Sequence, residues 1–402
     1  MNLAEILLVK NMIFDVAIFG SGISAKISAI ALAKNNLSVC IISDCKKNED
    51  IHETNLVTFM SIGSIHYLQT ILTNYKIFDQ YEEIKEINCM LVGVNNIIDQ
   101  TINFNDNKNE ILGKIVQNSF LESCLDNEIK NIPDIKFIHN SNISQYHDTV
   151  NGVHLELTNK EIINSKLFIL SSSKNKELIK KTDIKFINYD FEQDALSILI
   201  DYKTKQKNCA FQKFTNQGPI AVLPYSKNKS SIVWSVNRDS DILKKSKNEL
   251  EVSLRKNLKE FIYDLEITNI ERHSLKFQYA KKLTSKNTVL IGNIAHNIHP
   301  IAGQGLNLSI KDIALLVKKM TKYQALGYRV NDKILLKEFD QERRLDNTLY
   351  SFGTFTLDSI LKNQNRFLNF TVQKGLNLVE KNKMLKKVFV NSATGKSFFS
   401  AL

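Results

Sequence analysis

Apolar residues along this chain switch between short strand-like runs and longer patterns with helical spacing. Near the start, Ile13 to Phe19 predicts a strand, 26–34 predicts a helix, and 37–42 predicts a second strand. Much later, Val289 to Ile291 predicts a buried strand, and the apolar spacing from Asn307 predicts a helix. Two strand–turn–helix units, far apart in sequence, therefore frame the chain.

The segments between these units mix both patterns. We expect helices over 54–68, 112–129 and 239–267, and strands within 81–104 and at 167–170, 195–201, 209–214, 220–223, 231–236 and 277–283. The runs 135–138, 143–147 and 153–157 are expected to form a small β-meander with a turn at Asn151-Gly152. The tail, 335–402, is predicted to be helical and basic.

The turn after the first strand has the spacing G-x-G-x-x-A. Gly20 permits the tight turn, Gly22 lets a pyrophosphate approach the backbone, and the small Ala25 lets helix and strand pack closely. Because a strand precedes this turn and a helix follows it, we predict a dinucleotide site here. A plain turn between strand and helix is the alternative.

The late unit carries a second glycine-containing loop. Gly292 ends the strand, Pro300 bounds the loop, and Gly303 and Gly305 flank Gln304. Glycines let backbone N–H groups come close to a ligand, and a helix start presents unpaired N–H groups and the positive end of a dipole. This arrangement predicts a site for an electron-rich group.

Together the two units resemble the flavin-dependent aromatic hydroxylases of the p-hydroxybenzoate hydroxylase fold, and within them the ubiquinone-biosynthesis branch. The matching positions of the late motif are Gly292, Asn293, Ala295, His296, His299, Pro300, Ala302, Gly303, Gln304, Gly305, Asn307, Leu308 and Asp312. The resemblance implies an α/β fold: a Rossmann-like FAD-binding domain with an inserted β-sheet substrate domain and a helical C-terminal tail.

The resemblance also implies a division of the chain. The FAD-binding domain would comprise 12–75, 107–185 and 278–334, the substrate domain 76–106 and 186–277, and the C-terminal helices 335–402.

By the same resemblance, the chain would bind FAD, take electrons from NAD(P)H and use O₂ to hydroxylate a polyprenylated phenol on the way to ubiquinone. Expected cofactor contacts are Gly20, Ser21, Gly22, Ser24, Ala25, Ser43, Asp44, Gly292, Asn293, Ala302, Gly303, Gly305, Leu306 and Asn307. The residues expected to act on the flavin ring and the substrate are Pro300, Gly303, Gln304 and Gly305.

Four places depart from the family pattern. Ser43 stands where relatives carry a ribose-binding acid, and Asp44 follows one residue later; a simple loop acid is the alternative for Asp44. Leu56 and Ser119 stand where relatives have arginines, and Ser172-Ser173 replaces an Asp-Gly pair. These departures motivate a second hypothesis, a degenerate family member that serves as a structural subunit of a ubiquinone-biosynthesis assembly. A flavin reductase or halogenase of the same fold is a third.

Composition narrows the choice of partners. The net charge is +11, but no dense basic run with interleaved aromatics occurs, so we expect no nucleic-acid binding. The five cysteines are odd in number and scattered, with no C-x-x-C pair, so we expect a protein of the reduced cytoplasm. No apolar run approaches the length of a membrane span, and the start of the chain lacks a signal-peptide pattern. Peripheral membrane contact through the basic tail stays open as an alternative. The pair His296 and His299 lies inside the flavin motif, so we expect no metal.

Overall fold

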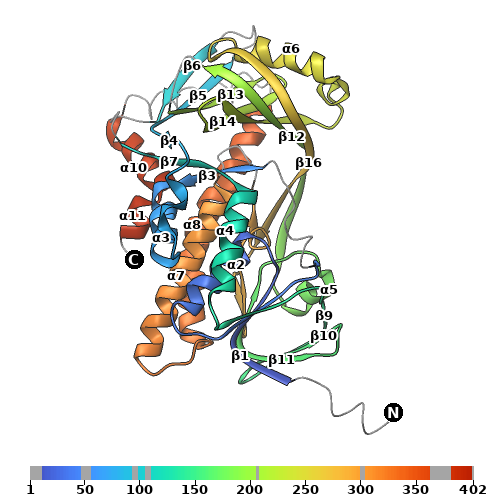
Figure 1. Ribbon diagram of the computed structural model, residues 1–402, viewed down its shortest axis with the longest axis vertical. Helices are drawn as coiled ribbons and strands as arrows, with labels where there is room; N and C mark the ends of the chain where they lie inside the picture. Colours follow the sequence, from blue (N-terminus) through green and yellow to red (C-terminus); the bar gives the residue numbers. More distant parts are fainter. Residues whose placement is uncertain are drawn as a thin grey trace.

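The computed structural model describes residues 11–46, 56–92, 98–104, 110–204, 208–298, 304–362 and 382–400. Two eight-stranded sheets and one three-stranded sheet form its β structure. One large sheet lies at each end of the molecule, and the long helices stand between them (Figure 1).

The first sheet has a parallel core. Its strands are β1 (Asn11–Phe19), β2 (Val39–Ile42), β8 (Ile135–Ile138), β9 (Ile143–Thr149), β10 (Gly152–Leu157), β11 (Ile162–Leu170), β17 (Thr284–Ser285) and β18 (Thr288–Leu290). The parallel order is β18–β11–β1–β2–β8. Strands of a parallel sheet are covered on both faces, which explains the unbroken apolar run at the end of β1.

The meander expected over 135–157 is wrong in part. β9 and β10 do form an antiparallel hairpin, but β10 continues the pairing onto β11. β8 leaves the hairpin and pairs with β2 in parallel. Local sequence favours a hairpin between neighbours, whereas the partner of β8 lies about a hundred residues earlier and is selected by burial of its apolar ends.

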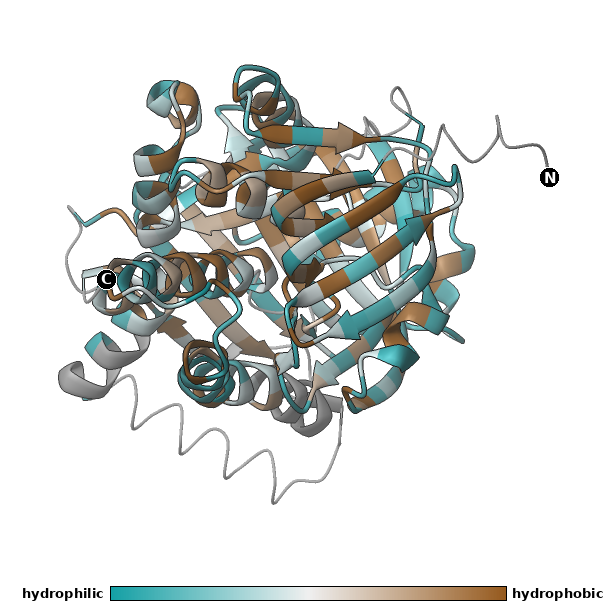
Figure 2. Cartoon of the chain, turned by 90° about the horizontal axis from the view of Figure 1, so that it is seen from below, coloured by the Kyte–Doolittle hydropathy of each residue, from teal (hydrophilic) through white to brown (hydrophobic). Residues whose placement is uncertain are grey.

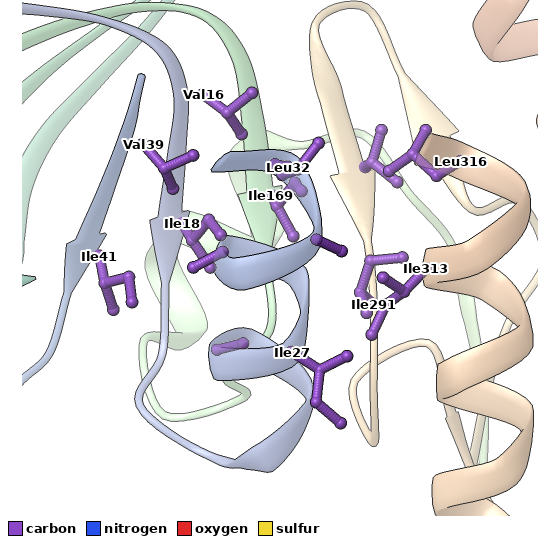
Figure 3. Close-up of a cluster of buried hydrophobic side chains, with 14 of the residues drawn as sticks. Val16, Ile18, Ile27, Leu32, Val39, Ile41, Ile169, Ile291, Ile313 and Leu316 are labelled. Carbon is purple, nitrogen blue, oxygen red and sulfur yellow. The ribbon is translucent and has the colours of Figure 1, made fainter. Parts of the chain in front are cut away.

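Helix α2 (Ile23–Ala33) lies between this sheet and helix α7 (Gly305–Ala325), and most of its residues are buried. Figure 3 shows Ile18 of β1, Ile27 of α2 and Ile313 of α7 in one cluster of buried side chains. The first and last strand–turn–helix units of the sequence therefore share one core.

The second sheet is mostly antiparallel. Its strands are β5 (Glu86–Val92), β6 (Ile98–Asn103), β12 (Phe186–Thr204), β13 (Cys209–Thr215), β14 (Gly218–Ser226), β15 (Lys229–Asn237), β16 (Ile262–Ala280) and β19 (His296–Asn297). Their order is β19–β16–β12–β15–β14–β13–β5–β6. Helix α6 (Lys247–Leu258) covers the outer face, where Leu250 and Leu254 belong to the same buried cluster as Trp234.

The helix expected over 239–267 is wrong at both ends. A short 3₁₀ turn, Asp241–Lys244, precedes α6, and α6 ends at Leu258. From Ile262 the chain enters β16, which pairs with β12 along almost its whole length. That long pairing overrides the local helical spacing.

The third sheet consists of β3 (Val57–Ser61), β7 (Gly113–Gln117) and β4 (Glu83–Ile84). Helix α3 (Ile62–Ile71) follows β3, and helix α4 (Asn118–Lys130) follows β7. The helices expected from residues 54 and 112 therefore begin later, because the residues expected to form their first turns pair as strands β3 and β7 instead. Residues 54 and 55 lie outside the described residues.

The tail is helical as expected where it is described. It contains α8 (Lys333–Lys362), α10 (Lys383–Thr394) and α11 (Lys396–Ser400). The ring of Phe399 in α11 stacks on Tyr67 of α3, with 5.7 Å between ring centroids. Hydrophobic segments concentrate along the strands and the inner helices in Figure 2. None of the helices in the described ranges is both long and apolar enough to cross a membrane.

Candidate functional site

Three strand ends meet at the turn between β1 and α2. Gly20 has φ +132°, and a Cβ there would lie 3.2 Å from the carbonyl carbon of Ser171, which follows β11. Gly292, after β18, has φ +87°, and a Cβ there would lie 3.2 Å from the side chain of Ser24. Both glycines are required, because a side chain would be strained by φ and crowded by the neighbouring chain. The two glycine segments of the sequence thus lie directly against each other.

A cavity of about 320 Å³ opens beside this junction. Its lining comes from both glycine segments and from the third sheet and its helix: Gly22, Ile23, Ser24, Thr58, Asn118, Glu122, Ser171, Asn293 and Leu306. Of the expected cofactor contacts, the structure brings Gly22, Ser24, Asn293 and Leu306 together here.

Sequence reasoning missed three of the polar lining residues. The hydroxyl of Thr58 donates to Oδ1 of Asn118 at 2.7 Å, which joins β3 to the start of α4. Asn118 and Glu122 are four residues apart and therefore share one face of α4. The i, i+4 spacing could have indicated this pair, but only with the correct start of the helix.

The cavity has room for a ligand at the helix starts. A Cβ added at Gly22 or at Gly305 would meet no described atom within 4 Å. Gly22 is the N-cap of α2 and has no side chain to cap it. Gln304, which is buried, is the N-cap of α7, and its side chain does not cap that helix. Both helices therefore direct first-turn N–H groups and the positive end of a dipole toward this region. Pro300, Ala302 and Gly303 lie outside the described residues.

Asn307 fixes the start of α7 to β3. Its side-chain Nδ2 donates to the carbonyl of Phe59 at 2.8 Å, and its Oδ1 accepts from the backbone N–H of Ser61 at 2.9 Å. The side chain is buried and thus completes a hydrogen-bond pair with a strand, a role that the sequence did not indicate.

The end of β2 differs from the expectation. The hydroxyl of Ser43 is buried and accepts from the backbone N–H of Cys45 at 3.1 Å. Asp44 is partly exposed, and its Oδ1 lies 3.1 Å from Nζ of Lys174, which follows β11. Partial burial lowers the pKa of Lys174, but the hydrogen bonds to Asp44 and Cys45 outweigh it and raise the pKa. At this edge Asp44 is better placed than Ser43 to meet a ligand.

The other residues singled out in the sequence lie at the turn after β1 or near the cavity. Ser21 is half-buried in the turn, and Ala25 is fully buried against the strand. Leu56 accepts a backbone hydrogen bond from Asn118, one residue before Ser119, so two of the departures from the family pattern adjoin. The hydroxyl of Ser172 accepts from the backbone N–H of Lys174.

A buried network holds the segment that leads into the late loop. Nε2 of His296 lies 2.6 Å from Asp312 of α7, and the other oxygen of Asp312 accepts from Nε of Arg343 of α8, also at 2.6 Å. Burial alone would raise the pKa of Asp312, but the charge of Arg343 and the hydrogen bonds from His296 and Arg343 lower it. Within the described ranges no cluster of three or more His, Cys, Asp or Glu side chains could hold a metal.

Comparison with known proteins agrees with this geometry. A family model for an FAD binding domain matches residues 178–346. The ubiquinone hydroxylase UbiL of Rhodospirillum rubrum is 23% identical, over 71% of this chain and 67% of that protein. The 3-demethoxyubiquinol 3-hydroxylase of Escherichia coli is 24% identical, over 71% of this chain and 73% of that protein. The mitochondrial ubiquinone biosynthesis monooxygenase COQ6 of Dictyostelium discoideum is 22% identical, over 96% of this chain and 92% of that protein.

Solved structures share the fold. The p-nitrophenol 4-monooxygenase PnpA of Pseudomonas putida superposes with a TM-score of 0.74 at 11% identity, covering 96% of this chain and 99% of that one. PqsL of Pseudomonas aeruginosa, described as a probable FAD-dependent monooxygenase, also gives a TM-score of 0.74, at 15% identity, covering 89% of this chain and 99% of that one. The expected fold class is confirmed.

Proposed function

We propose that this chain, which is similar to the FAD-binding domain family and to the hydroxylases named above, is an FAD-dependent monooxygenase that hydroxylates the aromatic ring of a polyprenylated phenol in ubiquinone biosynthesis. One oxygen atom of O₂ would enter a ring C–H bond and the other would leave as water, with NAD(P)H as the two-electron reductant. The named relatives act in ubiquinone biosynthesis, which supports this substrate class.

The observation that carries the proposal is the cavity where Gly22, Asn293 and Leu306 meet. The open space at Gly22 fits a dinucleotide, since this glycine lines the cavity and a side chain there would enter it. In this proposal the start of α2 holds the pyrophosphate, Asn293 meets the ribityl chain or a phosphate, and Asp44 meets the ribose.

When bound, FAD accepts electrons from NAD(P)H and activates O₂. The protein would bind FAD, orient the substrate against it and shield the reaction from water. The start of α7, fixed to β3 by Asn307, would direct its dipole at the flavin ring and stabilise negative charge there. The second sheet would exclude water from the space above the ring.

Two buried hydroxyls support a substrate position against the inner face of the second sheet. Ser197 pairs in register with Val233, and Leu199 pairs with Ser231, so these side chains share the face opposite Trp234. Leu199 packs in one cluster with Phe59 of β3. The hydroxyls of Ser197 and Ser231 have no hydrogen-bond partner among the described residues. A phenol oxygen of the substrate would supply one.

One observation favours the second candidate, a structural subunit without catalysis. The described lining of the cavity contains one acid, Glu122, and no lysine or arginine. The negative charge of a pyrophosphate would therefore rest on helix starts alone, which favours weak binding. This is the electrostatic consequence of the departures at Leu56 and Ser119.

The test separates the two functions. The purified protein is titrated with FAD while absorbance and fluorescence are recorded, and NAD(P)H oxidation with a demethoxyubiquinol analogue is then measured at saturating FAD. We expect a partly apo protein that turns yellow and forms hydroxylated product. Absence of bound flavin at saturation, combined with lowered ubiquinone after deletion of the gene, would establish the structural role instead.

A further inference from the structure

A second cavity, of about 440 Å³, lies on the other side of α7 from the candidate flavin site. Its lining comes from four helices: Lys311, Leu315 and Lys318 of α7, Glu342, Arg343 and Asp346 of α8, Ser392 of α10, and Ser397 and Phe398 of α11. At 100° per residue, Lys311 and Leu315 are turned roughly 140° and 180° from Leu306 around the axis of α7. The two cavities are therefore separate.

The central group of this cavity is a buried lysine with spare donors. Lys311 is 3% exposed, and its Nζ donates to the carbonyl of Ser392 at 3.2 Å. The nearest carboxylate, that of Asp346, lies 3.8 Å away, beyond hydrogen-bond distance. A lysine ammonium has three donors, and among the described residues this one has a single hydrogen-bonded acceptor. An ammonium in this position is costly unless an acceptor completes it.

The two acids of the cavity serve other cations. Asp346 accepts from Arg343 at 2.6 Å, and Glu342 accepts from Lys319 at 2.7 Å. The bond to Arg343 holds Asp346 with its Oδ2 3.8 Å from Nζ of Lys311, close enough for charge attraction but too far for a hydrogen bond. Among the described residues, no carboxylate oxygen lies within hydrogen-bond distance of Nζ of Lys311.

Apolar groups line the space beside the charge. The ring of Phe398 has its centroid 5.7 Å from Nζ of Lys311 and 5.1 Å from the guanidinium carbon of Arg343. Leu315 adds an aliphatic surface. An organic molecule could rest its apolar part on these two side chains while its charged end meets the lysine.

We infer that this cavity binds a small organic carboxylate, with the carboxylate on Lys311 and the apolar part on Phe398 and Leu315. Pockets of this size commonly hold small molecules. The site does not depend on the proposed hydroxylase function. It adjoins the buried network, because Arg343 also binds Asp312, which binds His296.

The test is isothermal titration of benzoate into the full chain saturated with FAD, with inorganic phosphate as the second probe. We expect one benzoate per chain and binding of phosphate at least about tenfold weaker, since phosphate lacks the apolar part. Lys311→Met should weaken benzoate binding about tenfold to a hundredfold, as expected for loss of a charge-assisted hydrogen bond. Lys322→Met, an exposed lysine of the same helix, is the matched control and should leave affinity unchanged.

A second variant guards against misfolding of the first. Ser397→Trp fills the cavity from its exposed rim while Lys311 stays in place, and it should also abolish benzoate binding. Thermal unfolding confirms that each variant is folded. Equal benzoate affinity in the wild type and both variants, no binding to the wild type, or equal affinities for phosphate and benzoate would overturn the inference.

Discussion

Gly20 and Gly22 of the first turn are needed for different structural reasons, so substitutions at the two positions should have different effects. Gly22 has φ −70°, and a Cβ there meets no described atom within 4 Å, so Gly22→Val should fold normally. The valine would occupy the cavity and lower FAD affinity about a hundredfold, equivalent to about 2.7 kcal/mol. Gly20→Val should instead destabilise the fold by roughly 1–3 kcal/mol, because Gly20 has a positive φ and close neighbours.

Fluorescence titration with FAD and thermal unfolding of both variants check this contrast. Unaltered FAD affinity in a folded Gly22→Val protein would move the cofactor site away from this turn.

At the residue scale, sequence predicts best where chemistry follows from the local backbone. The turn at Gly20 and the start of α7 were found because glycine spacing between a strand and a helix has a direct geometric meaning. The pairing of Asp44 with Lys174 could not be found, since 130 residues separate the two. The same holds for Asn307, whose clamp on β3 joins residues 246 and 248 positions apart.

At the element scale, α7 and α8 are joined through Asp312, and this junction should depend on pH. The folded-state pKa of Asp312 is lowered from 3.8, so its contribution to stability is present above pH 3.8 and is lost as the pH falls through the lower, folded value. Asp312→Asn leaves the buried Arg343 without its buried carboxylate partner and should lower the free energy of unfolding at pH 7 by about 3 kcal/mol.

Urea unfolding between pH 7 and pH 3 measures the difference in free energy of unfolding between the wild type and Asp312→Asn. This difference should narrow below pH 3.8. Asp241→Asn, at an exposed position, is the control and should change little. A gap that stays constant down to pH 3 would mean that Asp312 contributes through packing rather than charge.

The predicted helix boundaries are wrong where a strand leads directly into a helix. β3 runs directly into α3 and β7 directly into α4, with no residue between the strand and the helix at either junction. Apolar residues of such a strand fit helical spacing as well as alternation over so few positions. The pairing partner decides between the two, and it lies more than fifty residues away.

At the scale of the whole molecule, the resemblance to a family supplied what local patterns could not. The pattern predicted two strand–turn–helix units, but their contact across about 270 residues follows from the parallel order β18–β11–β1. The second sheet likewise draws β5 and β6 from before the main β-rich segment and β19 from after it. These long-range pairings determine which side chains line the cavity.

This arrangement predicts where FAD should protect the chain from hydrogen exchange. The cavity is built from the β1–α2 turn, the start of α4, the segment after β18 and the start of α7. Saturating FAD should slow amide exchange in peptides covering 20–26, 118–122, 292–296 and 305–308. Peptides of α6, which covers the outer face of the second sheet, should exchange as before.

Binding should also stabilise the folded chain as a whole. At an FAD concentration a hundredfold above the dissociation constant, the free energy of unfolding should rise by about 2.7 kcal/mol. Gly22→Val is the control: with affinity a hundredfold lower it would be about half saturated at this FAD concentration, so its stabilisation should fall to about 0.4 kcal/mol and its protection should be clearly weaker. Protection centred on α6 and the outer sheet, with no change near Gly22, would place the cofactor elsewhere in the molecule and would remove the cavity from the proposed mechanism.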